Sequence, residues 1–201
     1  MMKTRIGCLI LVSLLVILLT ACRAANASAS INAPIEGSTA QIVEFYNNHV
    51  NALKTADRIT ITKHEQCEDI ANVSANQDET ITETFVNGKG TQDAQLYLND
   101  FLPAHGESFV SDLIASDVQS AACTQQGNGW RIQLAINSEV FSCGNEPEKL
   151  IEAMLSNGII VATLNAEGKV MALTHRFEYV EKAGESVIKD QLVRFEYQFI
   201  W

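Results

Sequence analysis

The sequence predicts an α+β fold in which an N-terminal helix packs on a curved antiparallel sheet. Three observations support this prediction. One segment near residue 40 has the spacing of an amphipathic helix, later segments alternate apolar and polar residues, and Gly-containing turns separate those segments. Long strands that are joined by tight turns tend to twist and curl, so we expect a curved sheet rather than a flat one.

The first predicted element is a helix from about Thr39 to Thr55. Ser38 and Gln41 fit a capping box, which satisfies free N–H groups where a helix begins. Apolar residues then recur at steps of three and four, which is typical of a helix that buries one face. This stripe consists of Ile42, Val43, Tyr46, Val50 and Leu53. The simplest partner for such a face is a sheet.

The next part of the chain is mostly polar. Residues 58–63 alternate isoleucine with threonine, which favours a strand. The stretch 68–93 predicts loops around the short run 81–86, with a turn at 87–90. A short helix is expected within 92–102 and would end before the following proline.

The second half of the chain is rich in strand signals. A hairpin is predicted over 121–136, around a turn that contains Asn-Gly. A helix is expected from Pro147 to Gly158, since proline suits a first helical turn and glycine suits a helix exit. A second hairpin over 159–181 and a long strand over 186–201 complete the predicted elements.

The final strand places its apolar side chains on one face and Arg194, Glu196 and Gln198 on the other, which predicts one buried and one solvated sheet face.

His175 falls on the apolar side of the preceding strand. It is either a core histidine held by a hydrogen bond or a polar group inside a ligand pocket, and the aromatic residues have the same two interpretations. The candidate ligand-facing residues are His175, Phe177, Tyr179, Phe195, Tyr197 and Phe199.

The first residues have the order of a secretory signal, with two cations, an apolar run over 6–19 and a small residue before Cys22. The run is roughly 14 residues long, whereas a membrane-spanning helix needs about 20.

Leu19-Thr20-Ala21-Cys22 resembles the lipobox of bacterial lipoproteins. The resemblance implies cleavage by signal peptidase II and a diacylated Cys22 on a cell membrane, outside the cytoplasm. Arg23 would imply the outer membrane of a host with two membranes. The alternative is an ordinary secretory signal with a chance cysteine.

We therefore expect a signal peptide over 1–21, a lipidated cysteine and flexible tether over 22–37, and a single α+β domain over 38–201. The domain's shape would be similar to the half-barrels of bacterial lipoprotein carriers, or to a cystatin-like or NTF2-like cone. The domain also resembles uncharacterised lipoproteins of Gram-positive bacteria, a likeness that implies no activity. The similar segments are Ile42–Asn47, Gly129–Leu134 and Leu164–Thr174.

The formal net charge of −10 argues against nucleic acid as a partner, because that binding needs clustered Lys and Arg. The expected partners are the membrane through the N-terminal lipid, a lipid or other apolar small molecule, and an envelope protein.

Three cysteines lie outside the signal and lipobox, namely Cys67, Cys123 and Cys143. A Cys123–Cys143 bridge and three buried free thiols are both open interpretations.

No catalytic motif is found in the sequence. His64, Cys67 and Glu68 have a short metal-ligand spacing, but a solvated polar loop is the preferred interpretation. We expect no enzymatic activity, no metal and no cofactor.

The first functional hypothesis is a module that binds an apolar or amphiphilic ligand on the concave sheet face. The second is an envelope interaction or maintenance module with a filled core. A cavity of about 300 Å³ or more would favour the first hypothesis.

Overall fold

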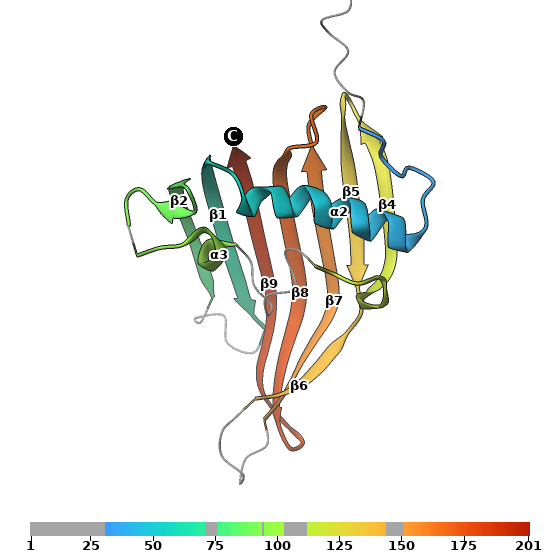
Figure 1. Ribbon diagram of the computed structural model, residues 1–201. Helices are drawn as coiled ribbons and strands as arrows, with labels where there is room; N and C mark the ends of the chain where they lie inside the picture. The colour runs from blue at the N-terminus through green and yellow to red at the C-terminus, as the bar shows by residue number, and fades with distance from the viewer. Residues whose placement is uncertain (1–30, 71–75, 94, 103–111, 144–150) are drawn as a thin grey trace, which may run out of the picture. The chain divides into compact units, whose positions relative to one another are not determined.

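The structure, a computed structural model, is shown in Figure 1 and describes residues 31–70, 76–93, 95–102, 112–143 and 151–201. Residues 32–201 form one compact unit, and all the elements below belong to it. The expected signal peptide, the lipidation site Cys22 and most of the tether lie outside the described residues. Among the described residues, no helix has both the length and the apolar character needed to cross a membrane.

Helix α2, over Thr39–Lys54, begins and ends close to where the periodicity predicts it. Its start has the expected capping box. The backbone N–H of Ser38 donates to Gln41 Oε1 at 2.9 Å, and the N–H of Gln41 donates to Ser38 Oγ at 3.4 Å. Every residue of the predicted apolar stripe is buried. This burial shows that the stripe packs on the rest of the unit.

Within the described residues, nine strands form one antiparallel sheet with the order β3-β2-β1-β9-β8-β7-β5-β4, and β6 also pairs with β7. The strands are β1 Arg58–Asp69, β2 Gln77–Val86, β3 Lys89–Gly90, β4 Val118–Gln126, β5 Gly129–Ile136, β6 Glu139–Cys143, β7 Ile151–Leu164, β8 Val170–Ala183 and β9 Ser186–Ile200. The short helices α3 (Leu98–Phe101) and η3 (Ala115–Asp117) lie between β3 and β4. In the part of the chain that the structure describes, the end strands β3 and β4 do not pair with each other, so the sheet is open. The broad prediction of an α+β fold with antiparallel strands is confirmed.

Turns that the sequence predicts join several of these strands. Asn87 and Gly88, between β2 and β3, have φ angles of 50° and 76°, which is the backbone of a type I′ hairpin turn. The turn between β7 and β8 is closed by Asn165, whose Oδ1 accepts from the backbone N–H groups of Glu167 and Lys169 at 3.0 and 2.9 Å. These local hydrogen bonds hold the neighbouring strands in a fixed register.

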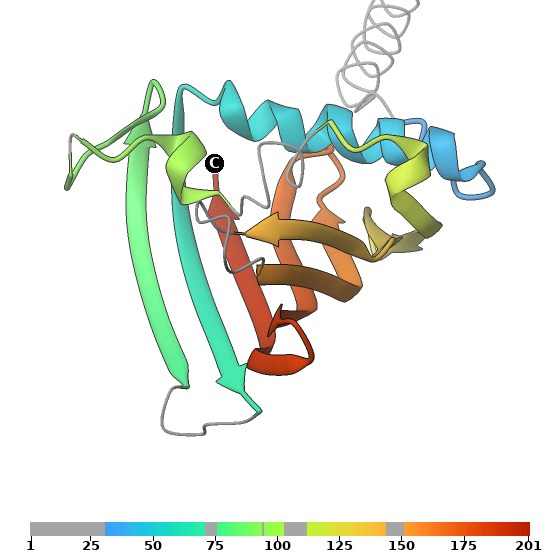
Figure 2. The same cartoon turned by 90° about the horizontal axis from the view of Figure 1, so that it is seen from below.

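Helix α2 lies against only one of the two faces of the sheet. Figure 2 shows α2 along one side of the strands, which we call the helix face; the other side is the open face. Buried and less buried residues alternate along β5 and β7, as expected for a sheet with one packed side. The largest fully buried side chains of the core include Tyr46 from α2, Phe85 from β2, and Tyr197 and Phe199 from β9.

The first strands are longer than the sequence predicts. β1 continues to Asp69 and β2 begins at Gln77, so much of the stretch predicted as loop is strand. Both strands are paired with a neighbouring strand along most of their length. The backbone N–H and C=O groups of their polar residues therefore have hydrogen-bond partners. Pairs on the open face add side-chain hydrogen bonds, such as Thr60 Oγ1 to Thr84 Oγ1 at 2.8 Å. The helix predicted within 92–102 is reduced to the four residues of α3.

The predicted helix over 147–158 is wrong in its described part, because residues 151–158 belong to β7. Residues 147–150 lie outside the described residues. β7 pairs with β6 and β8 on its two sides here, and Ala153 and Leu155 are buried in alternation. These long-range pairings outweigh a weak helical spacing. The sequence analysis also missed β6, a short strand without a strong apolar pattern.

Candidate ligand-binding site

The candidate site lies on the helix face, where β7, β8 and β9 extend beyond α2 (Figure 1). The register between β8 and β9 aligns Phe195 with His175 and Val193 with Phe177. Alternate residues of a strand share one face, so these four side chains lie on the same side as Tyr197, which is part of the core under α2. We call Phe177, Tyr179, Val193 and Phe195 the apolar floor.

A continuous row of aromatic rings joins the apolar floor to the core. The ring centroids are 4.8 Å apart for His175 and Phe177, and 6.2 Å apart for Phe177 and Phe195. The row continues with Phe195 and Tyr197 at 6.4 Å, and with Tyr197 and Phe199 at 6.2 Å. These spacings lie within the range of favourable aromatic pairs. The core therefore holds the floor in position.

The predicted ligand-facing residues divide into two groups. His175, Tyr197 and Phe199 are only 3%, 1% and 2% exposed. Phe177, Tyr179 and Phe195 are half-buried, so each presents part of its ring at the surface. The register brings both groups onto one face, but only the second group could meet a ligand without rearrangement of the core. Their role as ligand contacts stays a prediction.

Charged side chains border the floor. Lys63 Nζ lies 5.0 Å from the ring centroid of Phe195 and 2.9 Å from Glu65 Oε2. Lys189 Nζ lies 5.4 Å from the ring centroid of Tyr179, whose hydroxyl donates to Glu181. Lysines placed over ring faces are attracted by the π electrons. The border therefore offers both signs of charge next to an aromatic surface.

A hollow of about 570 Å³ adjoins the floor at the far end of β1 and β9. Cys67 and Val193 contribute buried apolar surface to it, and Glu65, Glu181 and Lys189 contribute charged groups. Its volume falls within the range of small-molecule pockets, which begins at about 300 Å³. Sequence reasoning missed the part of β1 that forms this hollow, although the alternation of residues 59, 61, 63, 65 and 67 could have placed it on the helix face.

Cys123, one of the two cysteines of the expected bridge, is unbridged in the structure. Cys67 and Cys123 are both free and buried, so a Cys123–Cys143 disulfide is wrong. Burial raises the pKa of both thiols, which makes them less reactive at neutral pH. His64 and Cys67 point to opposite faces, because β1 is a strand here rather than the predicted loop. No group of metal-binding side chains is found among the described residues.

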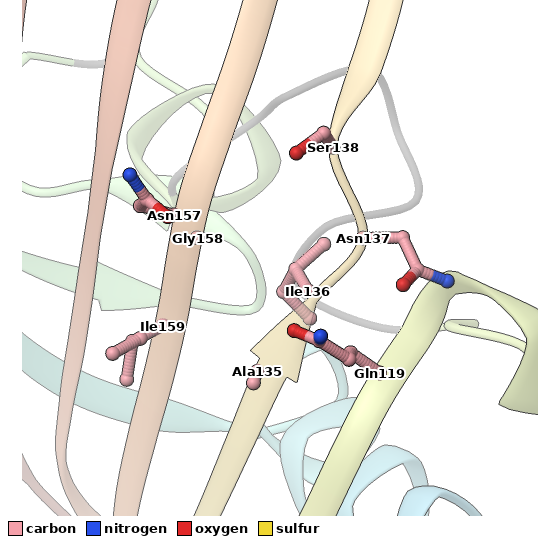
Figure 3. A pocket seen from close by; sticks show the side chains of 8 residues that line it. All are labelled: Gln119, Ala135, Ile136, Asn137, Ser138, Asn157, Gly158 and Ile159. Atoms are coloured by element: carbon pink, nitrogen blue, oxygen red, sulfur yellow. The ribbon is translucent and has the colours of Figure 1, made fainter.

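A smaller hollow lies on the open face, where the chain leaves β5 and before it enters β6 (Figure 3). Figure 3 shows the side chains of Gln119, Asn137, Ser138 and Asn157 around it. Two of these are already engaged, since Asn137 Nδ2 donates to the carbonyl of Ser116 at 2.6 Å and Asn157 Nδ2 donates to Glu178 Oε2 at 2.8 Å. The volume of about 270 Å³ is below the usual range of ligand pockets. This hollow is therefore the weaker candidate for a ligand site.

Comparison with known proteins gives no relative: no protein-family model, no curated protein and no solved structure matches the chain. A shared fold would in any case not define an activity. The function is therefore inferred from the chemistry of the residues described above.

Proposed function

We propose that the protein is a non-catalytic lipoprotein, held on a membrane outside the cytoplasm by lipid on Cys22, that binds an apolar or amphiphilic ligand on its helix face. The observation that carries the proposal is the apolar floor beyond α2. Phe177, Tyr179 and Phe195 expose ring surface there, next to a hollow of about 570 Å³. The lipidation part of the proposal rests on the lipobox alone.

The physical basis of binding is burial of the exposed rings. Burial contributes about 25 cal/mol for each Å² of apolar surface removed from water. The charged groups at the border would hydrogen-bond a polar head, while the rings contact the apolar part of the ligand. Lys63 and Lys189 are already paired with carboxylates. A neutral or zwitterionic head therefore fits better than a strongly charged one.

We also propose that the sheet curves as a half-barrel or a cone, so that the helix face is concave. Neighbouring strands in a sheet are rotated by about 20–25° on average, and this rotation accumulates across many strands. Irregularities in the register at Ser156–Ile159 and at Glu181–Lys182 lie beside the floor, and bulges of this kind increase twist and bend a strand.

A second candidate is an envelope interaction or maintenance module whose interior is simply filled. The core under α2 favours it, since Tyr46, Val50 and Leu53 are fully buried against the sheet. A ligand could not enter there without displacing the helix. The two candidates therefore differ in what occupies the uncovered end of the helix face.

The test is a fluorescence titration with N-phenyl-1-naphthylamine, a neutral apolar probe. We expect Phe195→Asp to weaken probe binding at least tenfold, because a charge in the floor would have to be desolvated. The matched control is Ile200→Asp, which adds the same charge to β9 at a position that is 68% exposed on the open face. Its affinity should stay within twofold of the original chain.

Methyl-labelled NMR of the unchanged chain makes the test independent of variant stability. Bound probe should shift the methyl signals of Val193 on the helix face, and should leave those of Val161 on the open face unmoved. Equal affinity of both aspartate variants, or shifts confined to Val161, would contradict the proposed site.

A further inference from the structure

A larger groove lies on the open face, over β5, β7, β8 and β9. Its volume is about 850 Å³, and Arg131, Arg176 and Arg194 line it. Glu178 is the one acidic side chain among its lining residues. The whole chain has 14 Lys and Arg against 24 Asp and Glu. Three arginines in one groove therefore give a local positive charge on an otherwise acidic protein.

Two of these arginines occupy an unfavourable arrangement. Arg176 and Arg194 lie directly opposite each other in the register of β8 and β9, and like charges in such positions destabilise a sheet. Arg194 forms an ion pair with Glu196, whose second oxygen lies 3.5 Å from His64 Nδ1. Within the described ranges, Arg176 has no ion pair. The fold thus keeps an uncompensated guanidinium beside a second one.

The one acidic residue that lines the groove does not occupy Arg131 or Arg176. Glu178 Oε2 accepts from Asn157 Nδ2 at 2.8 Å and from Ser156 Oγ at 3.4 Å, so this carboxylate is engaged across to β7. Within the described ranges, Arg131 has no ion pair either. A bound anion would therefore not have to displace an existing carboxylate from Arg131 or Arg176.

The groove also has an apolar side. Ile159, Val161 and Leu192 line it, and Leu192 is 40% exposed. Half-buried Ile159 and Val161 and exposed Leu192 lie beside the guanidiniums, an arrangement that matches a molecule with an anionic head and a hydrocarbon part. Each guanidinium can bind two oxygens of one anion, and a phosphate monoester has three unshared oxygens, enough for contacts to both Arg176 and Arg194.

We propose that this arginine groove, defined by Arg131, Arg176, Arg194, Ile159, Val161 and Leu192, binds an amphiphile through its phosphate group. The phosphate lies between Arg176 and Arg194, and the apolar part covers Ile159, Val161 and Leu192. The arginines of this groove lie on the opposite face of the sheet from the rings of the apolar floor, and Phe177 is the one floor residue that also lines the groove. Phe195→Asp tests the floor and Arg176→Gln tests the groove, and neither of these residues belongs to the other site.

The experiment is calorimetric titration of the full chain, held in phosphatidylcholine nanodiscs, with hexyl phosphate. Hexyl glucoside and inorganic phosphate are the comparison probes, because they separate the apolar and the phosphate contributions. We expect hexyl phosphate to bind more tightly than either. Arg176→Gln should weaken its binding at least tenfold, and the control Arg58→Gln, an arginine outside the groove, should change it less than twofold.

A stability measurement separates binding from a structural role. Because Arg176→Gln removes a like-charge contact, its melting temperature should equal or exceed that of the original chain. The proposal is overturned if hexyl phosphate fails to bind, if Arg176→Gln binds it as tightly, or if hexyl glucoside binds equally well. It is also overturned if nanodiscs with anionic lipid shift the Val161 methyl signals while hexyl phosphate does not, which would indicate contact with a membrane surface instead.

Discussion

Gly129→Ala is expected to lower the free energy of unfolding by about 3 kcal/mol, the upper end of the range for overpacked sites. Gly129 begins β5, next to the end of β7. A Cβ atom at this position would lie 1.9 Å from the carbonyl oxygen of Leu164 and 3.1 Å from the Cα of Asn165. Both are backbone atoms, so no side chain can rotate away. The strands would have to separate where β5 meets β7, and chemical denaturation would measure the loss.

The control for this prediction is Gly184→Ala, in the turn between β8 and β9. Gly184 has a φ of +62°, but an added Cβ would meet nothing within 4 Å. Its cost is therefore backbone strain alone, which is about 1–2 kcal/mol for a residue in the left-handed region. If Gly129→Ala proved no more damaging than Gly184→Ala, the close approach of β5 to β7 would be contradicted.

Glu83→Ala is also expected to lower the free energy of unfolding by about 3 kcal/mol, because it would leave several hydrogen-bond donors without a partner. Glu83 is 4% exposed on β2. Its Oε1 accepts from the backbone N–H groups of Thr84, Thr91 and Gln92 at 2.8, 2.9 and 3.1 Å, and from Thr91 Oγ1 at 3.2 Å. This one carboxylate fixes the chain that follows β3. Loss of protection from amide hydrogen exchange at Thr91 and Gln92 would accompany the loss of stability.

Glu83→Gln is the matched variant, because it keeps an acceptor oxygen and removes only the charge. We expect it to cost about 1 kcal/mol, the difference between charged and neutral hydrogen bonds. Burial alone would raise the pKa of Glu83, but the hydrogen bonds from Gln92, Thr91 and Thr84 outweigh burial and lower it.

The pH dependence of stability follows from this lowered pKa. The carboxylate stabilises the fold above its unfolded pKa of about 4.3, and that stability is lost as the pH falls through the lower folded pKa. Glu83→Gln should lack this acidic step in unfolding curves recorded between these two values. An unchanged pH profile would show that Glu83 is not held as an ion in the fold.

The sequence predicts best those elements whose cause is local. The capping box at Ser38 and Gln41 and the stripe that follows define α2, because both depend on residues a few positions apart. The turn at Asn87 and Gly88 was predictable for the same reason, since few residues adopt positive φ at low cost. The alternation along β9 likewise identified its two faces.

The parts that were missed depend on partners distant in the sequence. β7 carries a weak helical spacing, and only its pairing with β6 and β8 makes it a strand. The hollow beside the floor needs Cys67 and Val193 in register, which no local pattern specifies. Arg176 and Arg194 are 18 residues apart in sequence and become neighbours only through the β8–β9 register. One feature of the sequence could have indicated that Glu83 is buried: it lies two residues before the buried Phe85, and so on the same face of β2.

The most direct test of ligand binding on the helix face is native mass spectrometry of residues 23–201, produced without the lipid anchor and purified from cells. We predict a discrete adduct of lipid-like mass that is released on denaturation and is lost in the Phe195→Asp variant but kept in Ile200→Asp. A bare mass that stays bare after incubation with cell lipids would contradict a ligand-binding role. It would favour the alternative of a filled interaction module.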